Sequence, residues 1–191
     1  MTDLQVELLE RYTDDFVPSL DRILAAILTL MKWRPGISQF QIVKPLFIAD
    51  KKHLNESGRP VTYDRYVAME QGPVPSLAYD LLMKPEVFQT LYGRPPPWSV
   101  ETRSRGHRFT ATEGPDEDSL SRTDLAALRE GVGVVDKLNK IQLSELLHKD
   151  PAWVEAWGRR GNARKVPMRA VKLLEDEDEE AIANLRLLSR S

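Results

Sequence analysis

Only one stretch of this 191-residue chain alternates apolar and polar side chains, while its other apolar residues mostly follow helical spacing. The stretch consists of Trp98-Ser-Val-Glu-Thr and His107-Arg-Phe-Thr-Ala-Thr on either side of Arg103-Ser-Arg-Gly106. Alternation on both sides of a short turn predicts a β-hairpin. We therefore expect a mainly α fold of the α+β class, a compact helical domain with one short antiparallel β-hairpin near residues 98–112.

Capping residues and helix breakers divide the rest of the chain into helices. Ser19 and Ser38 precede the first two, and Ser121 with Asp124 resembles a capping box before a later one. Pro45 should kink the second helix because it removes an amide donor from the helix interior. The expected helices cover residues 20–33, 39–56, 77–83, 122–139, 143–148 and 151–157.

The two ends of the chain differ from its middle. We expect an N-terminal extension over residues 1–18, a central domain over residues 19–165 and a helical, acidic C-terminal tail over residues 166–191. The acidic run Glu175–Glu180 is typical of a solvated surface rather than of a metal site. Tails of this kind need not be ordered.

Composition excludes several classes of protein. The chain has 27 Lys and Arg against 29 Asp and Glu, so its formal charge is −2 and its whole surface is no nucleic-acid footprint. It has no Cys, which excludes disulfides, thiol nucleophiles and Cys-ligated zinc. The acidic N-terminus lacks the features of a signal peptide, and the apolar run 23–31 is far shorter than the ~20 residues that span a bilayer. We expect a cytoplasmic protein with no membrane partner.

The residues also give little support to an enzyme. His53, His107 and His148 stand alone, without the spacing of metal ligands. The chain contains neither the glycine-flanked serine of hydrolases nor a phosphate-binding glycine pattern, and Gly131-Val-Gly133 indicates close helix packing instead. We expect no catalytic residues, no cofactor and no metal.

Basic residues leave one alternative function open. Arg103, Arg105, His107 and Arg108 gather at the tip of the expected hairpin, and a second basic cluster lies within residues 159–165. Helices followed by a basic hairpin are the order of a winged-helix, DNA-binding transcriptional regulator. The near-neutral charge favours the simpler interpretation that these are solvated loops, so DNA is the less favoured partner.

Two separated blocks of sequence resemble a known family. The first contains Lys44-Pro-Leu-Phe-Ile-Ala-Asp50, Gly58-Arg-Pro-Val-Thr-Tyr-Asp-Arg-Tyr-Val-Ala-Met69 and Gln71-Gly-Pro-Val-Pro-Ser76, and the second contains Leu143-Ser-Glu-Leu-Leu-His148 and Asp150-Pro-Ala-Trp153. Together they resemble the Panacea domain family of SocA-like antitoxins, which are often described as phage-associated proteins. The usual lead-in of the family has an ordinary helix former where this chain has Pro45.

The resemblance implies an antitoxin of a toxin–antitoxin system. Such a protein is no enzyme: it binds and neutralises a cognate protein toxin, usually encoded by the adjacent gene. One founding member delivers its toxin to a protease, so a role as a proteolytic adaptor and a protease as a further partner are included in this expectation.

The segment between Asp64 and Tyr79 is the expected binding surface. Prolines on either side of Val74 hold the backbone in one shape and so reduce the entropy lost on binding, while tyrosines are favoured anchors of interfaces. The alternative is that the segment merely turns the chain and its rings pack in the core. His148 and Trp153 are expected to fix a helix junction. The residues expected to contact the partner are Tyr63, Asp64, Arg65, Tyr66, Met69, Gln71, Gly72, Pro73, Pro75 and Tyr79.

Overall fold

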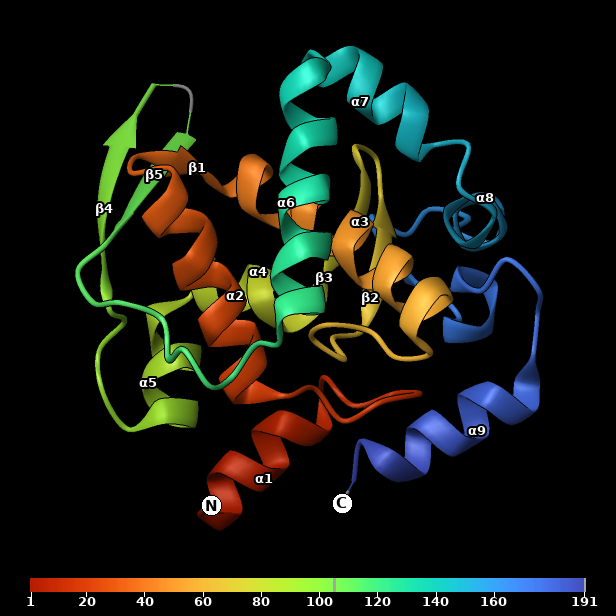
Figure 1. Ribbon diagram of the computed structural model, residues 1–191, viewed down its shortest axis with the longest axis horizontal. Coiled ribbons are helices and arrows are strands. Elements are labelled where there is room, and N and C mark those ends of the chain that lie inside the picture. Colours follow the sequence, from red (N-terminus) through yellow and green to blue (C-terminus); the bar gives the residue numbers. More distant parts are fainter. Residues whose placement is uncertain (105, 191) are drawn as a thin grey trace.

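The computed structural model describes residues 1–104 and 106–190 of the chain. In this part of the chain, two small antiparallel sheets lie on either side of the two longest helices, which cover residues 39–57 and 122–137 (Figure 1). The helices are α1 Asp3–Glu10, α2 Leu20–Trp33, α3 Gln39–Ser57, α4 Ser76–Met83, α5 Pro85–Tyr92, α6 Arg122–Lys137, α7 Lys140–Leu147, α8 Pro151–Gly158 and α9 Glu179–Leu188, with a 3₁₀ turn at Ala170–Leu173. The strands are β1 Ile37–Ser38, β2 Tyr66–Met69, β3 Gly72–Pro75, β4 Trp98–Arg103, β5 Gly106–Ala111 and β6 Lys165–Pro167.

The predicted fold class is confirmed, and so are most helix starts. Ser38 and Ser121 each accept a hydrogen bond from the amide three residues later, in full capping boxes. Asp150 caps α8 through its side chain, which accepts from the amides of Ala152 and Trp153, and Pro151 occupies the first helical position. Ser19 precedes α2 as expected, but its side chain makes no capping hydrogen bond.

The predicted hairpin is also confirmed. Strands β4 and β5 pair in register from Trp98 opposite Ala111 to Arg103 opposite Gly106. The two-residue strand β1 extends this sheet on the other side of β5. Arg105, at the tip of the predicted basic cluster, lies outside the described residues.

A second sheet, with the order β3-β2-β6, is present that the apolar pattern did not predict. Tyr66–Met69 reads as a continuous apolar run because the first three residues of β2 are buried, so no alternation marks it. The partner strand β3 carries Pro73 and Pro75 and lies at the sheet edge, where a strand tolerates residues without an amide hydrogen.

Close packing of α3 on α6 fixes the centre of the molecule. A Cβ atom on Gly131 would lie 2.5 Å from the carbonyl oxygen of Pro45, so only glycine permits this approach. Gly133, two residues further along the same helix, has no atom within 4 Å of its Cβ position. The prediction of close helix packing is therefore confirmed for Gly131 and not for Gly133.

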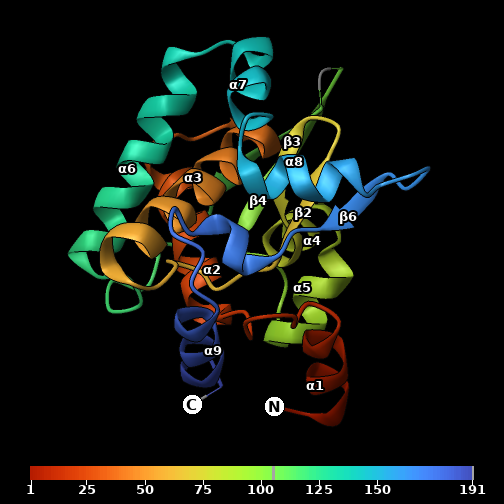
Figure 2. The same cartoon turned by 90° about the vertical axis from the view of Figure 1, so that its right-hand side faces the viewer.

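Both ends of the described chain pack onto the central domain. Leu9 and Tyr12 belong to the core beneath the first sheet, and Ile182 and Leu185 of α9 belong to a second core around β2. The N- and C-terminal helices reach the same end of the molecule (Figure 2). Among the described residues, no helix has the length and apolar character needed to cross a membrane.

Candidate functional site

The turn between β2 and β3 is exposed, and side chains from other segments hold its backbone in place. Glu70 and Gln71 form it and are exposed, whereas Gly72 behind them is buried. Gly72 has a φ of +94°, a backbone conformation that side chains with a Cβ rarely adopt. This positive angle lets the chain reverse within two residues.

Lys44 supports this turn from inside the protein. It lies in the middle of α3, only 1% of its surface is exposed, and its Nζ donates a hydrogen bond to the carbonyl oxygen of Pro73 at 2.9 Å. Burial, and to a lesser extent the nearby charge of Lys140, together lower the pKa of Lys44 from its ordinary value to about 7. Both ammonium groups lie 5.5 Å from the ring centre of Phe40.

His148 and Trp153 hold the turn from its other side. Their rings stack 4.0 Å apart. The Nε2 of His148 donates to the carbonyl oxygen of Glu70 at 3.0 Å, and the indole Nε1 of Trp153 donates to that of Met69 at 3.0 Å. These contacts join the α7–α8 junction to the β2–β3 turn, which sequence reasoning placed in separate parts of the molecule.

Asp50 anchors the start of β2. Its buried carboxylate accepts hydrogen bonds from the amides of Val61 and Thr62 at 2.9 Å, from the Tyr66 hydroxyl at 2.8 Å and from the Thr62 hydroxyl. Burial raises the pKa of Asp50, although the hydrogen bonds from Thr62 and Tyr66 act in the opposite direction. The hydroxyl of Tyr66 is therefore used inside the fold.

Asp64 caps the start of α4 with its carboxylate. Its two carboxylate oxygens accept from the amides of Leu77 at 3.0 Å and Ala78 at 2.8 Å, two donors that the helix itself leaves unpaired. Burial raises the pKa of Asp64 to about 7. Pro75, directly before the helix, has no side-chain group for this cap, so the carboxylate comes from eleven residues earlier.

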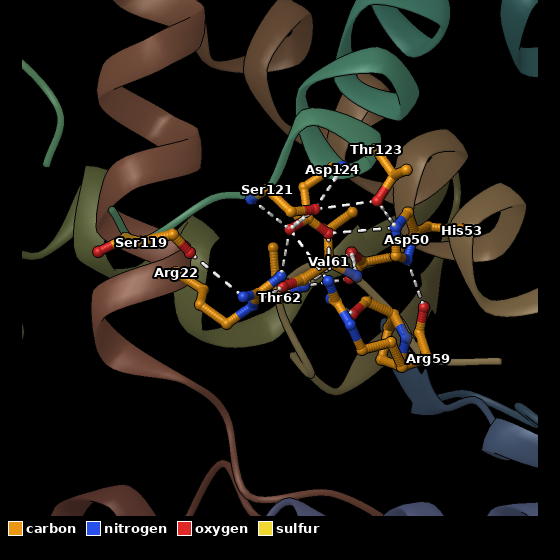
Figure 3. Close-up of polar contacts among 11 residues, drawn as sticks. Arg22, Asp50, His53, Arg59, Val61, Thr62, Ser119, Ser121, Thr123 and Asp124 are labelled. Carbon is orange, nitrogen blue, oxygen red and sulfur yellow. Dashed lines mark hydrogen bonds and ion pairs between the residues drawn. The ribbon is translucent and has the colours of Figure 1, made fainter. Parts of the chain in front are cut away.

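A third buried carboxylate, Asp124, ties three helical segments together (Figure 3). It accepts hydrogen bonds from the Arg22 guanidinium at 2.7 Å, from the Arg59 guanidinium at 3.1 Å, and from the Ser121 hydroxyl and amide at 2.7 and 2.8 Å, and its other oxygen forms an ion pair with Arg59 at 3.0 Å. Burial raises the pKa of Asp124, but the hydrogen bonds from Arg59, Ser121 and Arg22 outweigh it and hold that pKa well below its usual range.

His53 closes this cluster on the side of α3. Its Nδ1 donates to the carbonyl oxygen of Arg59 at 2.7 Å, which leaves Nε2 to accept from the Thr123 hydroxyl at 3.0 Å in the neutral ring. The Asp124 carboxylate lies 3.3 Å from the same nitrogen. The cluster joins α3 and α6 and supports the fold rather than an exposed site (Figure 3).

The residues expected to contact a partner divide by burial. Gln71 is exposed and marks the turn. The half-buried members are Tyr63, Arg65, Met69 and Tyr79, and the buried members are Asp64, Tyr66, Gly72, Pro73 and Pro75. The buried members act inside the fold in this structure, as caps, anchors and backbone constraints, so only the others offer side-chain surface.

Sequence reasoning missed the buried polar residues that hold this segment. Lys44 and Asp50 stand in the first block of the family resemblance but carried no role there, and Asp124 was noted only as a helix cap. The signal for Asp50 and Lys44 was a charged residue on the apolar face of a helix, which burial requires to be paired.

The basic residues of the DNA alternative are partly engaged within the protein. Arg103 forms two hydrogen bonds of 2.8 Å with Glu101. In the second basic cluster, Arg159 pairs with Glu155 at 3.0 Å and the guanidinium of Arg160 lies 4.2 Å from the ring centre of Trp157. These contacts reduce the free positive charge that a phosphate backbone would meet.

Fold and site together define a small α+β domain in which side chains of other segments donate hydrogen bonds to the backbone of one exposed turn. The sequence model of the family described as antitoxin SocA-like, Panacea domain, matches residues 42–154. The match covers more than half of the chain, so the protein belongs to this family, as the sequence blocks indicated. The matched range also contains Lys44, His148 and Trp153, which support the turn, and Asp50, which anchors the strand before it. No curated protein and no solved structure matches the chain.

Proposed function

We propose that the protein is the antitoxin of a toxin–antitoxin system and that it neutralises a cognate protein toxin by direct binding, without catalysis of its own. The antitoxin role follows from the family to which the chain belongs. The proposal places the protein in the cytoplasm and its toxin in the adjacent gene.

The observation that carries the binding mode is the support of the β2–β3 turn. The carbonyl oxygens of Met69, Glu70 and Pro73 each accept a hydrogen bond from a side chain of another segment. A turn held in this way loses little conformational entropy when a partner binds, and this raises affinity for a given set of contacts. The exposed Gln71 and the half-buried Met69 are the side chains that meet the toxin.

Growth rescue tests this proposal. The full chain is co-expressed with the product of the adjacent open reading frame in cells that this product stops from growing. Gln71→Trp places a large side chain on the turn and should weaken toxin binding at least about tenfold, because a blocked interface centre costs ~2 kcal/mol or more. Gln89→Trp, at an exposed position of α5, is the matched control and should rescue like the unaltered chain.

Toxin levels in the same cells distinguish the two modes of neutralisation. Blocking leaves the amount of toxin unchanged, whereas delivery to a protease lowers it and depends on that protease. Unchanged melting temperatures for both variants would show that the effect is on binding. Full rescue by Gln71→Trp would refute the placement of the toxin at the turn.

A further inference from the structure

A groove beside the β2–β3 turn has an unusual balance of charge. It has a volume of about 470 Å³, and no described residue along its lining is acidic. It lies at the end of the molecule where the tip of the β4–β5 hairpin and the α6–α7 junction are found (Figures 1 and 2). We call it the cationic groove; the lining residues used below are Phe40, Gln71, Arg108, Val135, Leu138 and Lys140.

Two cations of the groove are not held in an ion pair. Among the described residues, neither Arg108 nor Lys140 forms one, whereas Arg103 on the same hairpin is paired with Glu101. Glu101 also lies opposite Arg108 in the hairpin, and its pKa is lowered first by the hydrogen bond from Arg103 and then by the charge of Arg108. Lys140 is exposed, and Arg108 is half-buried. An anion that enters the groove would therefore meet two positive charges without breaking an ion pair.

The ammonium groups of Lys140 and Lys44 lie near the same aromatic ring. That of Lys140 lies 5.5 Å from the ring centre of Phe40, and the ammonium of Lys44 lies at the same distance from that ring. The two cations repel each other, which is one cause of the lowered pKa of Lys44. A carboxylate in the groove would relieve this repulsion, so the structure favours an anionic occupant over an empty groove.

The remaining lining selects a protein segment over a nucleic acid. Phe40, Val135 and Leu138 provide apolar surface, and Gln71 provides an amide beside it. A duplex requires a row of cations that follows its phosphates, whereas this groove presents two and the chain as a whole is slightly acidic. Two cations above an apolar floor fit a carboxylate side chain next to an apolar one.

We propose that the cationic groove binds an acidic, amphipathic segment of the toxin, whose carboxylates meet Arg108 and Lys140 while an apolar side chain packs on Phe40 and Leu138. The inference rests on the proposed function and extends it, because Gln71 belongs both to the turn and to the groove. The volume of about 470 Å³ accommodates several side chains, which is the size of such a segment rather than of a whole domain.

The test reverses the two charges in the full chain. Arg108→Glu combined with Lys140→Glu should lose growth rescue against the product of the adjacent toxic reading frame, and its affinity for that purified product should fall at least about tenfold. Arg122→Glu combined with Arg190→Glu changes the net charge equally at exposed positions that do not line the groove, and should bind like the unaltered protein. The affinity of the unaltered protein should also fall as salt rises from about 0.05 to 0.5 M.

The milder pair Arg108→Gln and Lys140→Gln keeps the test valid if charge reversal prevents folding, and should show a smaller loss in the same direction. Reversing acidic residues of the toxin should restore binding to the charge-reversed protein. Rescue by the unaltered chain and equally by the groove variants would overturn the inference and leave the proposed function standing. Absence of rescue by the unaltered chain would instead overturn the proposed function, and the inference with it. Intact toxin binding together with lost binding to a labelled promoter duplex would assign the groove to nucleic acid and overturn the inference.

Discussion

Replacing Gly131 by alanine should destabilise the protein, although alanine is the better helix former. Gly131 lies inside α6, where α6 packs against α3. The added Cβ would lie 2.5 Å from the carbonyl oxygen of Pro45 and 3.1 Å from its Cα. Both are backbone atoms of the facing helix, so no side-chain rotation can relieve the contact.

The magnitude follows from two opposing effects. The Cβ would be about 1 Å too close to the carbonyl oxygen, so the two helices must separate, and overpacking of this kind costs ~1–3 kcal/mol. The exchange of glycine for alanine in a helix interior returns at most ~1 kcal/mol. With the full gain of ~1 kcal/mol subtracted, we expect a net loss of up to ~2 kcal/mol in the free energy of unfolding.

Urea denaturation of the full chain measures this loss as a lower midpoint with an unchanged slope. Gly133→Ala is the matched control, because it lies in the same helix with no atom within 4 Å of its Cβ position. It should raise the free energy of unfolding by up to ~1 kcal/mol, which appears as a higher midpoint. Equal midpoints for the two variants would refute the reasoning, because they would show that α3 and α6 do not approach closely at Gly131.

Three further substitutions test the support of the turn, each by urea denaturation. The free energy of unfolding of the unaltered protein should rise between pH 7 and about 10, because Lys44 loses its proton near pH 7 when folded and near ~10.4 when unfolded. Lys44 contributes at most ~1.4 kcal/mol per pH unit to this rise, and Lys44→Met should lack the contribution. Parallel pH profiles for the two proteins would contradict the burial of the Lys44 charge. Gly72→Ala should cost ~1–3 kcal/mol, since φ is +94° and the new Cβ would lie 3.2 Å from that of Leu147; a neutral effect would exclude this backbone angle. Trp153→Phe should cost ~1–3 kcal/mol, because the carbonyl oxygen of Met69 loses its donor, and faster exchange of the turn amides should accompany it.

Local features of the fold could be predicted from the sequence because their causes are local. Ser38 and Ser121 mark helix starts through hydrogen bonds that span three residues. The hairpin at residues 98–112 shows alternation because most of β4 is exposed and only one face of the sheet packs inward. The family was recognised for the same reason, since its blocks are contiguous stretches of sequence.

The support of the candidate site could not be predicted because its causes are distant in sequence. Trp153 reaches Met69 across 84 residues, and Arg22 reaches Asp124 across 102. The frequency of tyrosine in interfaces predicts an exposed anchor at Tyr66, but the side chain is buried and its hydroxyl donates to Asp50. Composition and periodicity carry no record of such pairs, so the rings of the segment could not be assigned to the core or the surface.

The turn is held by contacts that do not depend on its own exposed side chains. Lys44, His148 and Trp153 determine where the turn lies, and each donates to a backbone carbonyl rather than to a side chain. Backbone acceptors persist when turn side chains change, so Glu70 and Gln71 can vary without loss of the contacts that hold them. If the proposed binding surface is correct, its position is set inside the domain, while its chemistry is set by a few exposed side chains.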